Sequence, residues 1–112
     1  MGWFSTNARL VCVIEGEGAV EYMDCVHLFQ ANEYADAQLR ALELGRTQEQ
    51  EYRNGEGKLV RWRLKELVSL DAVVADLDGA EVYSQPTPLE DGVEIPFDTV
   101  FRPEDSDPTS SI

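Results

Sequence analysis

Cys25 and His27 are the residue types from which nucleophilic catalysis is most often built, and they lie two positions apart. His27 is the only histidine, so any acid–base or metal role for an imidazole depends on it. Two such residues on one strand do not make a site, and we expect a structural or incidental role. Cys12 is expected on the opposite face of the sheet from Cys25, which argues against a disulfide and against zinc. We predict no metal, no cofactor and no catalytic residue.

Arg61, Arg63 and Lys65 alternate along one segment, and we call them the basic stripe. Three interpretations are open. Glu49 and Glu51 can neutralise the stripe from a neighbouring strand, the stripe can bind an anion or an acidic partner, or it can receive the chain's own acidic C-terminal residues.

The whole chain is acidic, with a net charge of −13 over 112 residues. Such a charge repels nucleic-acid backbones and is typical of a protein that binds a basic partner. The sequence has no secretory signal and no apolar run long enough to span a membrane, and its two cysteines suit a reducing compartment. We therefore expect a cytoplasmic protein that binds neither nucleic acid nor membrane.

All five prolines lie between residues 86 and 108, in a segment whose net charge is −6. This composition does not favour a central strand or a stable helix. We divide the chain into a domain, 1–85, and an acidic arm, 86–112. Within the arm, residues 89–101 place Val93, Ile95 and Phe97 at spacing two, which predicts either a strap on the domain or a segment that orders on a partner. Residues 102–112 are expected to be flexible.

Two apolar segments, 3–14 and 19–30, flank a glycine-rich turn and predict a β-hairpin. A three-residue loop at 16–18 makes paired residue numbers sum to 34. Even-numbered positions then form the core face and odd-numbered positions, including Arg9 and His27, form the other face. Asp24 does not fit this core face, which otherwise consists of Phe4, Ala8, Leu10, Cys12, Ile14, Val20, Tyr22, Val26 and Leu28.

Residues 33–44 predict a helix that Asn32 caps and Gly45 ends. Ala35, Leu39 and Leu42 would form its buried stripe.

A second hairpin is predicted for 47–53 and 58–70. A three-residue loop at 55–57 places Glu51 opposite Arg61 and Glu49 opposite Arg63, and these opposite charges favour that register. A helical turn at 72–77 and a strand at 81–85 complete the prediction. The fold class is α+β: an antiparallel sheet of four to five strands with one main helix on one face.

Several stretches resemble a family of small bacterial proteins known as domain of unknown function 4288. The strongest is Glu51-Tyr52-Arg53-Asn54-Gly55-Glu56-Gly57 followed by Val60-Arg61-Trp62-Arg63; Trp3-Phe4, the helix up to Gly45 and Glu81-Val82-Tyr83-Ser84 add to it. The resemblance covers about residues 3–85. It implies no mechanism, because the family has no established activity, and members usually end soon after the Val82-Tyr83 stretch, so the arm departs from the pattern.

From these features we expect a small acidic cytoplasmic interaction module, of the kind that acts as an immunity-type inhibitor of a basic partner protein. A homo-oligomerising or ligand-binding module is the alternative, with Trp3, Val11, Val13, Met23 and Phe29 at the centre of an open sheet face. An enzyme based on His27 and Cys25 is the third hypothesis. The candidate partner-binding residues are Arg61, Arg63, Lys65, Arg9, His27, Val93, Ile95 and Phe97.

Overall fold

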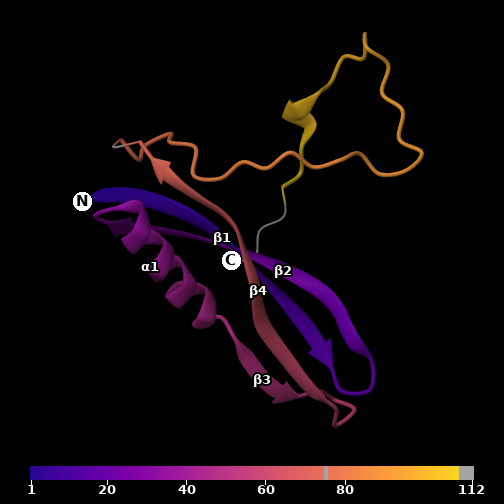
Figure 1. The fold of residues 1–112 in the computed structure, drawn as a ribbon. Helices are drawn as coiled ribbons and strands as arrows, with labels where there is room; N and C mark the ends of the chain where they lie inside the picture. The colour runs from indigo at the N-terminus through magenta and orange to yellow at the C-terminus, as the bar shows by residue number, and fades with distance from the viewer. Residues whose placement is uncertain (75, 109–112) are drawn as a thin grey trace.

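The computed structural model, which describes residues 1–74 and 76–108, is an antiparallel sheet with one helix on one face (Figure 1). The sheet has the strand order β2-β1-β4-β3. The elements are β1 (Gly2–Ile14), β2 (Gly18–Ala31), α1 (Tyr34–Arg46), β3 (Gln50–Arg53), β4 (Leu59–Val73) and a short 3-10 turn, η1 (Pro103–Asp105). The α+β class and the four-stranded antiparallel sheet are confirmed. No helix in the described part of the chain is long and apolar enough to cross a membrane.

The core lies between the sheet and α1. The even-numbered residues of the central strand β1 supply it, and Phe4, Ala8, Leu10 and Cys12 are all buried, as predicted. From β2 and the helix, the core receives Phe29, Ala31, Ala37 and Ala41.

The predicted register of the first hairpin is wrong. The turn occupies residues 15–17, so Ile14 pairs with Gly18, and a β-bulge then adds one residue to β2. Cys12 pairs with Glu21, and from there to the end of the hairpin the paired numbers sum to 33. Because side chains alternate between the two faces, this odd sum reverses every later residue of β2.

The reversal exchanges the faces of β2. Cys25, His27 and Phe29 lie on the helix face, whereas the even-numbered apolar residues predicted for the core are exposed on the other. These are Val20, Tyr22, Val26 and Leu28. Asp24 is no longer a misfit, because it lies on the open side opposite Arg9.

The predicted helix is present, but its buried stripe and its ends differ. Glu33 occupies the N-cap position, and the buried residues are Ala37, Ala41 and Gly45. Gly45 does not end the helix. A Cβ on Gly45 would lie 3.0 Å from Leu64 Cδ1 and 3.4 Å from Ala8 Cβ, so glycine permits close packing of α1 on the sheet. Leu39, predicted for the stripe, points to solvent.

The second hairpin has the predicted register, with Glu51 opposite Arg61 and Tyr52 opposite Val60. Glu49 does not meet Arg63, because β3 begins only at Gln50. Instead, a Glu49 carboxylate oxygen accepts a hydrogen bond from the backbone N–H of Leu64, at 3.0 Å.

Two elements predicted beyond the second hairpin do not form in the described residues, and residue 75 of the predicted helical turn lies outside them. Strand β4 continues to Val73, with two irregularities in its pairing with β1, so no helix starts at Ala72. Residues 81–85 belong to no strand. They belong to a long excursion that starts beyond the end of β4 and loops away from the sheet (Figure 1).

Candidate functional site

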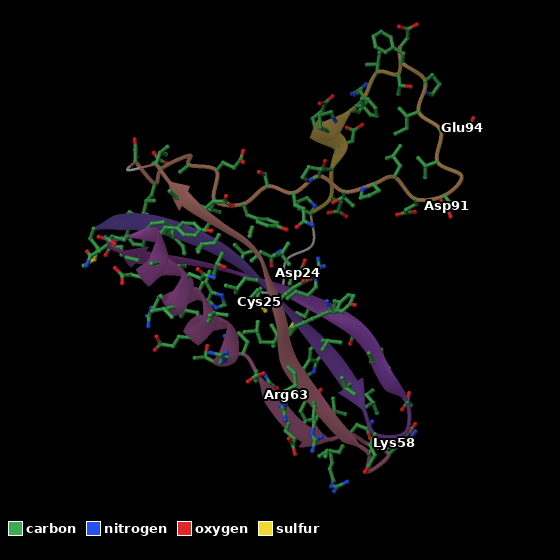
Figure 2. All side chains as sticks on the ribbon, viewed as in Figure 1. Asp24, Cys25, Lys58, Arg63, Asp91 and Glu94 are labelled. Atoms are coloured by element: carbon green, nitrogen blue, oxygen red, sulfur yellow. The ribbon has the colours of Figure 1, made fainter. Side chains whose placement is uncertain are left out.

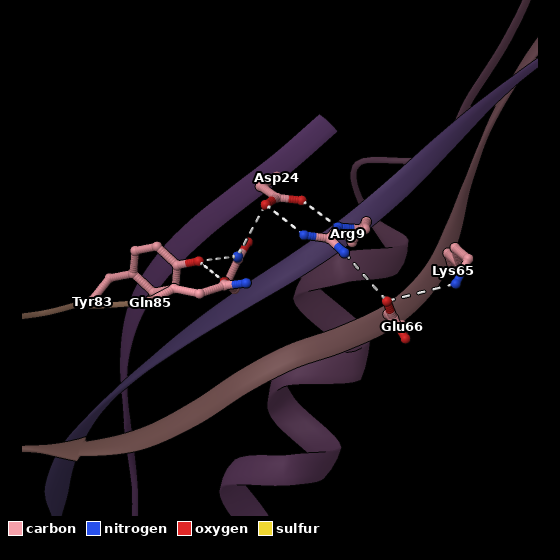
Figure 3. Close-up of polar contacts among 7 residues, drawn as sticks. Arg9, Asp24, Lys65, Glu66, Tyr83 and Gln85 are labelled. Carbon is pink, nitrogen blue, oxygen red and sulfur yellow. Dashed lines mark hydrogen bonds and ion pairs between the residues drawn. The ribbon is translucent and has the colours of Figure 1, made fainter. Parts of the chain in front are cut away.

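The face of the sheet that α1 leaves uncovered, here the open face, carries a polar network (Figure 3). Arg9 on β1 donates hydrogen bonds to Asp24 on β2 from Nε, at 2.9 Å, and from Nη2, at 3.2 Å. Asn7 Nδ2 donates to Asp24 Oδ2 at 3.3 Å and to the Tyr83 hydroxyl at 2.8 Å. Tyr83 in turn donates to Gln85. The network therefore joins two strands to a residue far along the chain.

The charges in this network are matched. The hydrogen bonds from Arg9 hold the pKa of the Asp24 carboxyl below its ordinary value, and the bond to Asp24 raises the pKa of Arg9. Arg9 also lies 3.6 Å from Glu66 and over the ring of Tyr22, 5.4 Å from its centroid. These contacts make Arg9 a positioned residue.

Asn7 is completely buried, which is unusual for an amide side chain. Its Oδ1 has no partner among the described protein groups, and neither has Oγ of Ser69, the residue opposite it on β4. Such buried polar atoms ordinarily bind water or a ligand. Sequence reasoning missed this site, although Ser5-Thr6-Asn7 was a visible signal: three polar residues in succession inside an apolar strand, all buried.

The start of the arm covers this network and forms a groove of about 350 Å³ with it. Arg9 and Asp24 form the sheet side, and Tyr83 and Gln85 lie next to them. The remaining wall is the arm segment Pro86, Thr87 and Pro88. The arm is thus in contact with the open face at its beginning.

The basic stripe is neutralised largely within the domain. Arg61 Nε and Arg63 Nη2 lie 3.2 and 2.8 Å from the same oxygen of Glu51, and the hydrogen bond from Arg63 lowers the pKa of Glu51. Lys65 lies 3.6 Å from Glu66. None of the ion pairs found in residues 1–74 and 76–108 joins the stripe to the arm. This geometry agrees with the first of the three interpretations for Glu51 but not for Glu49, whose place is taken by Glu66.

Cys25 and His27 share the helix face of β2, opposite Ala8 and Thr6 respectively. Burial, followed by the charge of Asp24, raises the pKa of the Cys25 thiol, whereas a nucleophilic cysteine needs a lowered pKa. Met23 and Phe29 lie on this face too, and Phe29 is buried, whereas Trp3, Val11 and Val13 of β1 lie on the other face. The five residues predicted as the centre of an open oligomerisation face therefore do not share one face.

Beyond Pro88 the arm leaves the domain. Val93 and Ile95 are about half exposed, and Phe97 is fully exposed. Asp91 and Glu94 point away from the sheet on the same excursion, far from Arg63 and Lys58 (Figure 2). Residues 89–101 therefore do not form the strap. Of residues 102–112, predicted to be flexible, 109–112 lie outside the described residues.

The comparisons with known proteins give one match. A family model described as a domain of unknown function, DUF4288, matches residues 3–84. These residues include all of the sheet except Gly2, the helix, and Tyr83 of the polar network, whereas Gln85, the groove wall at Pro86–Pro88 and the rest of the arm lie outside the match. No curated protein and no solved structure matches the chain.

Proposed function

The chain belongs to the DUF4288 family, and from the arm that follows the family's domain we propose that it is a protein-interaction module that binds a basic partner. The arm is the binding element in this proposal, and the domain holds it in place. The finer form of the proposal is an immunity-type inhibitor that acts in the cytoplasm.

The exposure of the arm's apolar side chains carries the proposal. Phe97 is fully exposed, Val100 is 84% exposed, and Leu89 and Phe101 are about two-thirds exposed. Apolar groups gathered in this way without a partner lose the free energy that burial would provide. A segment that orders on another protein recovers that free energy on binding.

The charges between these residues indicate the class of partner. Glu90, Asp91, Glu94 and Asp98 alternate with the apolar residues, and within 86–101 no basic residue offsets them. Carboxylates at the rim of an interface attract a basic surface and accelerate association, and the aromatic side chains supply most of the affinity. This is the pattern expected for binding to a cationic groove.

The network at Tyr83 supports the proposal from the side of the domain. It fixes Tyr83, three residues before the arm, to buried Asn7, so the arm leaves the domain at a defined place. A segment tethered in this way searches a smaller volume than a free tail, which reduces the entropy lost on binding.

Affinity capture with tagged full-length chain tests the proposal. Phe97→Ser removes an exposed side chain from the arm, and the matched control, Leu39→Ser, removes a 69% exposed one from α1. We expect a basic protein to be retained by the wild type and by Leu39→Ser. Its affinity for Phe97→Ser should be about 10- to 100-fold lower, the effect of about 1.5–3 kcal/mol of aromatic burial. Retention should also fall as salt rises from about 0.15 M.

The proposal fails if all proteins captured by the wild type are captured equally by Phe97→Ser, or if the retained proteins are acidic. Binding that depends on Arg61 and Arg63 instead would assign the function to the basic stripe.

A further inference from the structure

We infer that β2 is the self-association edge of this protein: two copies pair antiparallel through β2 about a two-fold axis and form one continuous eight-stranded sheet. This inference concerns the domain and is independent of the arm's proposed partner.

The first observation is the free edge itself. β2 is the terminal strand of the sheet and has 14 residues, whereas the other terminal strand, β3, has four. Every second residue of β2 directs its backbone N–H and C=O away from β1. No backbone hydrogen bond from elsewhere in the described chain reaches this outer side. A long edge of unpaired backbone groups is a template for another strand.

The second observation is that the edge lacks the features that keep edge strands apart. Natural edges are protected by lysine, proline, β-bulges or a short length. The bulge of β2 lies near its start, between Ala19 and Glu21, and the strand is regularly paired with β1 from Glu21 to Ala31. β2 contains no lysine, arginine or proline. Its two charged residues are Glu21 and Asp24, and Asp24 is already bound by Arg9. In a chain of net charge −13, β2 is thus a long segment with few charges.

The third observation is the exposed apolar row beside the edge. Val20, Tyr22, Val26 and Leu28 lie on the open face of β2, with 43–59% of each residue exposed. Paired strands bring side chains on the same face within about 5 Å of each other, so a neighbouring strand would cover this row.

The sequence of β2 also complements itself. About a two-fold axis perpendicular to the sheet, the numbers of two opposite residues add to a constant. This sum is even, because opposite residues must share a face of the sheet. A sum of 48 sets Val20 opposite Leu28 and Tyr22 opposite Val26.

The charges select the same register. A sum of 48 places Glu21 opposite His27 of the second copy, an acid opposite the only imidazole of the chain, whereas sums of 46 and 50 place Glu21 opposite Cys25 and Phe29. Asp24 meets its own copy at the axis. Each of these carboxylates keeps its bonds to Arg9 and Asn7, which offset the repulsion.

The paired region would cover residues 20–28, about 30 Å of strand. Backbone hydrogen bonds and two symmetric sets of apolar pairs would hold it. An interface of this length is small, so we expect an equilibrium between monomer and dimer in the micromolar range.

Sedimentation velocity of the full chain, from about 1 µM to about 1 mM, tests the inference. We expect a dimer whose population rises with concentration. Val26→Lys should raise the dimer dissociation constant about 100-fold, because the change occurs twice in each dimer and costs about tenfold at each site. Leu39→Lys, which places the same charge on an exposed apolar site of α1, should leave it unchanged.

A full chain that stays monomeric at the highest concentration overturns the inference. A dimer that Val26→Lys does not weaken also overturns it, because the interface then lies elsewhere. If Val26→Lys does not fold, Leu28→Lys and hydrogen exchange of the wild type replace it: the backbone amides of β2 must become more protected as concentration rises, and unchanged protection refutes the pairing. Loss of the dimer leaves the arm's proposed partner untouched, since the arm variants are assayed separately.

Discussion

Replacement of Gly45 by valine tests the close contact between α1 and the sheet. On an exposed helix position, glycine to valine stabilises by a few tenths of a kcal/mol, because valine has the higher helix propensity. At Gly45 the new Cβ meets Leu64 Cδ1 at 3.0 Å and Leu64 Cδ2 at 3.1 Å, closer than carbon atoms normally approach. Overpacking of this kind costs about 1–3 kcal/mol. Helix propensity would raise the free energy of unfolding and overpacking would lower it, so the sign of the measured change shows which effect is larger.

The expected result is a loss of about 1–2 kcal/mol in the free energy of unfolding. In a domain of this size that corresponds to a decrease in melting temperature of roughly 4–16 °C. Urea denaturation followed by the fluorescence of Trp3 and Trp62 measures it. Gly55→Val provides the comparison, because a Cβ at Gly55 meets nothing within 4 Å.

A double-mutant cycle identifies the atom responsible. Leu64→Ala removes both methyl groups that obstruct the new side chain, so Gly45→Val should cost far less in that background than in the wild type. Equal costs in the two backgrounds, or a stabilised single variant, would refute the argument that glycine is needed at position 45 for close packing of α1 on the sheet.

Two further predictions concern the polar network on the open face. Tyr83→Phe removes the hydroxyl to which Asn7 donates, so it should lower the free energy of unfolding by about 0.5–1.5 kcal/mol and make the chain near Gln85 more sensitive to proteolysis. Tyr34→Phe, at an exposed tyrosine, should do neither. Equal melting temperatures for the two variants would contradict the contact. Asp24→Asn should destabilise the protein at neutral pH but not in acid. The folded state lowers the pKa of Asp24, so the ionised carboxylate stabilises the fold above about pH 4, where the carboxyl of the unfolded chain ionises. This stabilisation is lost as the pH falls through the lowered pKa. A difference between wild type and variant that persists at about pH 2 would show that the charge is not the cause.

Local signals predicted the second hairpin and the existence of α1. Asn54 and Gly57 define the turn, and Glu51 opposite Arg61 fixes its register. These features depend on residues within about a dozen positions of one another. The features that the sequence predicted wrongly depend on residues that lie far apart in the chain. In the sequence, a glycine that ends a helix cannot be told from one that packs against Leu64. Only the position of the sheet in the folded protein decides between the two.

The polar network was invisible for the same reason. Asn7 and Tyr83 are 76 positions apart, and the sequence of the segment that carries Tyr83 predicts a short strand, which the structure does not contain. Tyr83 contacts the sheet through its side-chain hydroxyl, and its backbone does not pair with a strand. Two grooves between this segment and the sheet flank the contact. A local sequence pattern can suggest a strand, but it cannot predict which part of the fold the segment lies against.

The register error of the first hairpin follows from a conflict between two criteria. The charge criterion that fixed the second hairpin also applies to the first: a sum of 33 sets Arg9 opposite Asp24, and a sum of 34 sets Arg9 opposite Cys25. The apolar criterion favours 34, because that register buries Val20, Tyr22, Val26 and Leu28. In the fold the charges are paired and the four apolar residues are left outside. A sequence that gives up so much apolar burial within the monomer is explained if those residues are buried elsewhere, and pairing through β2 supplies that second surface.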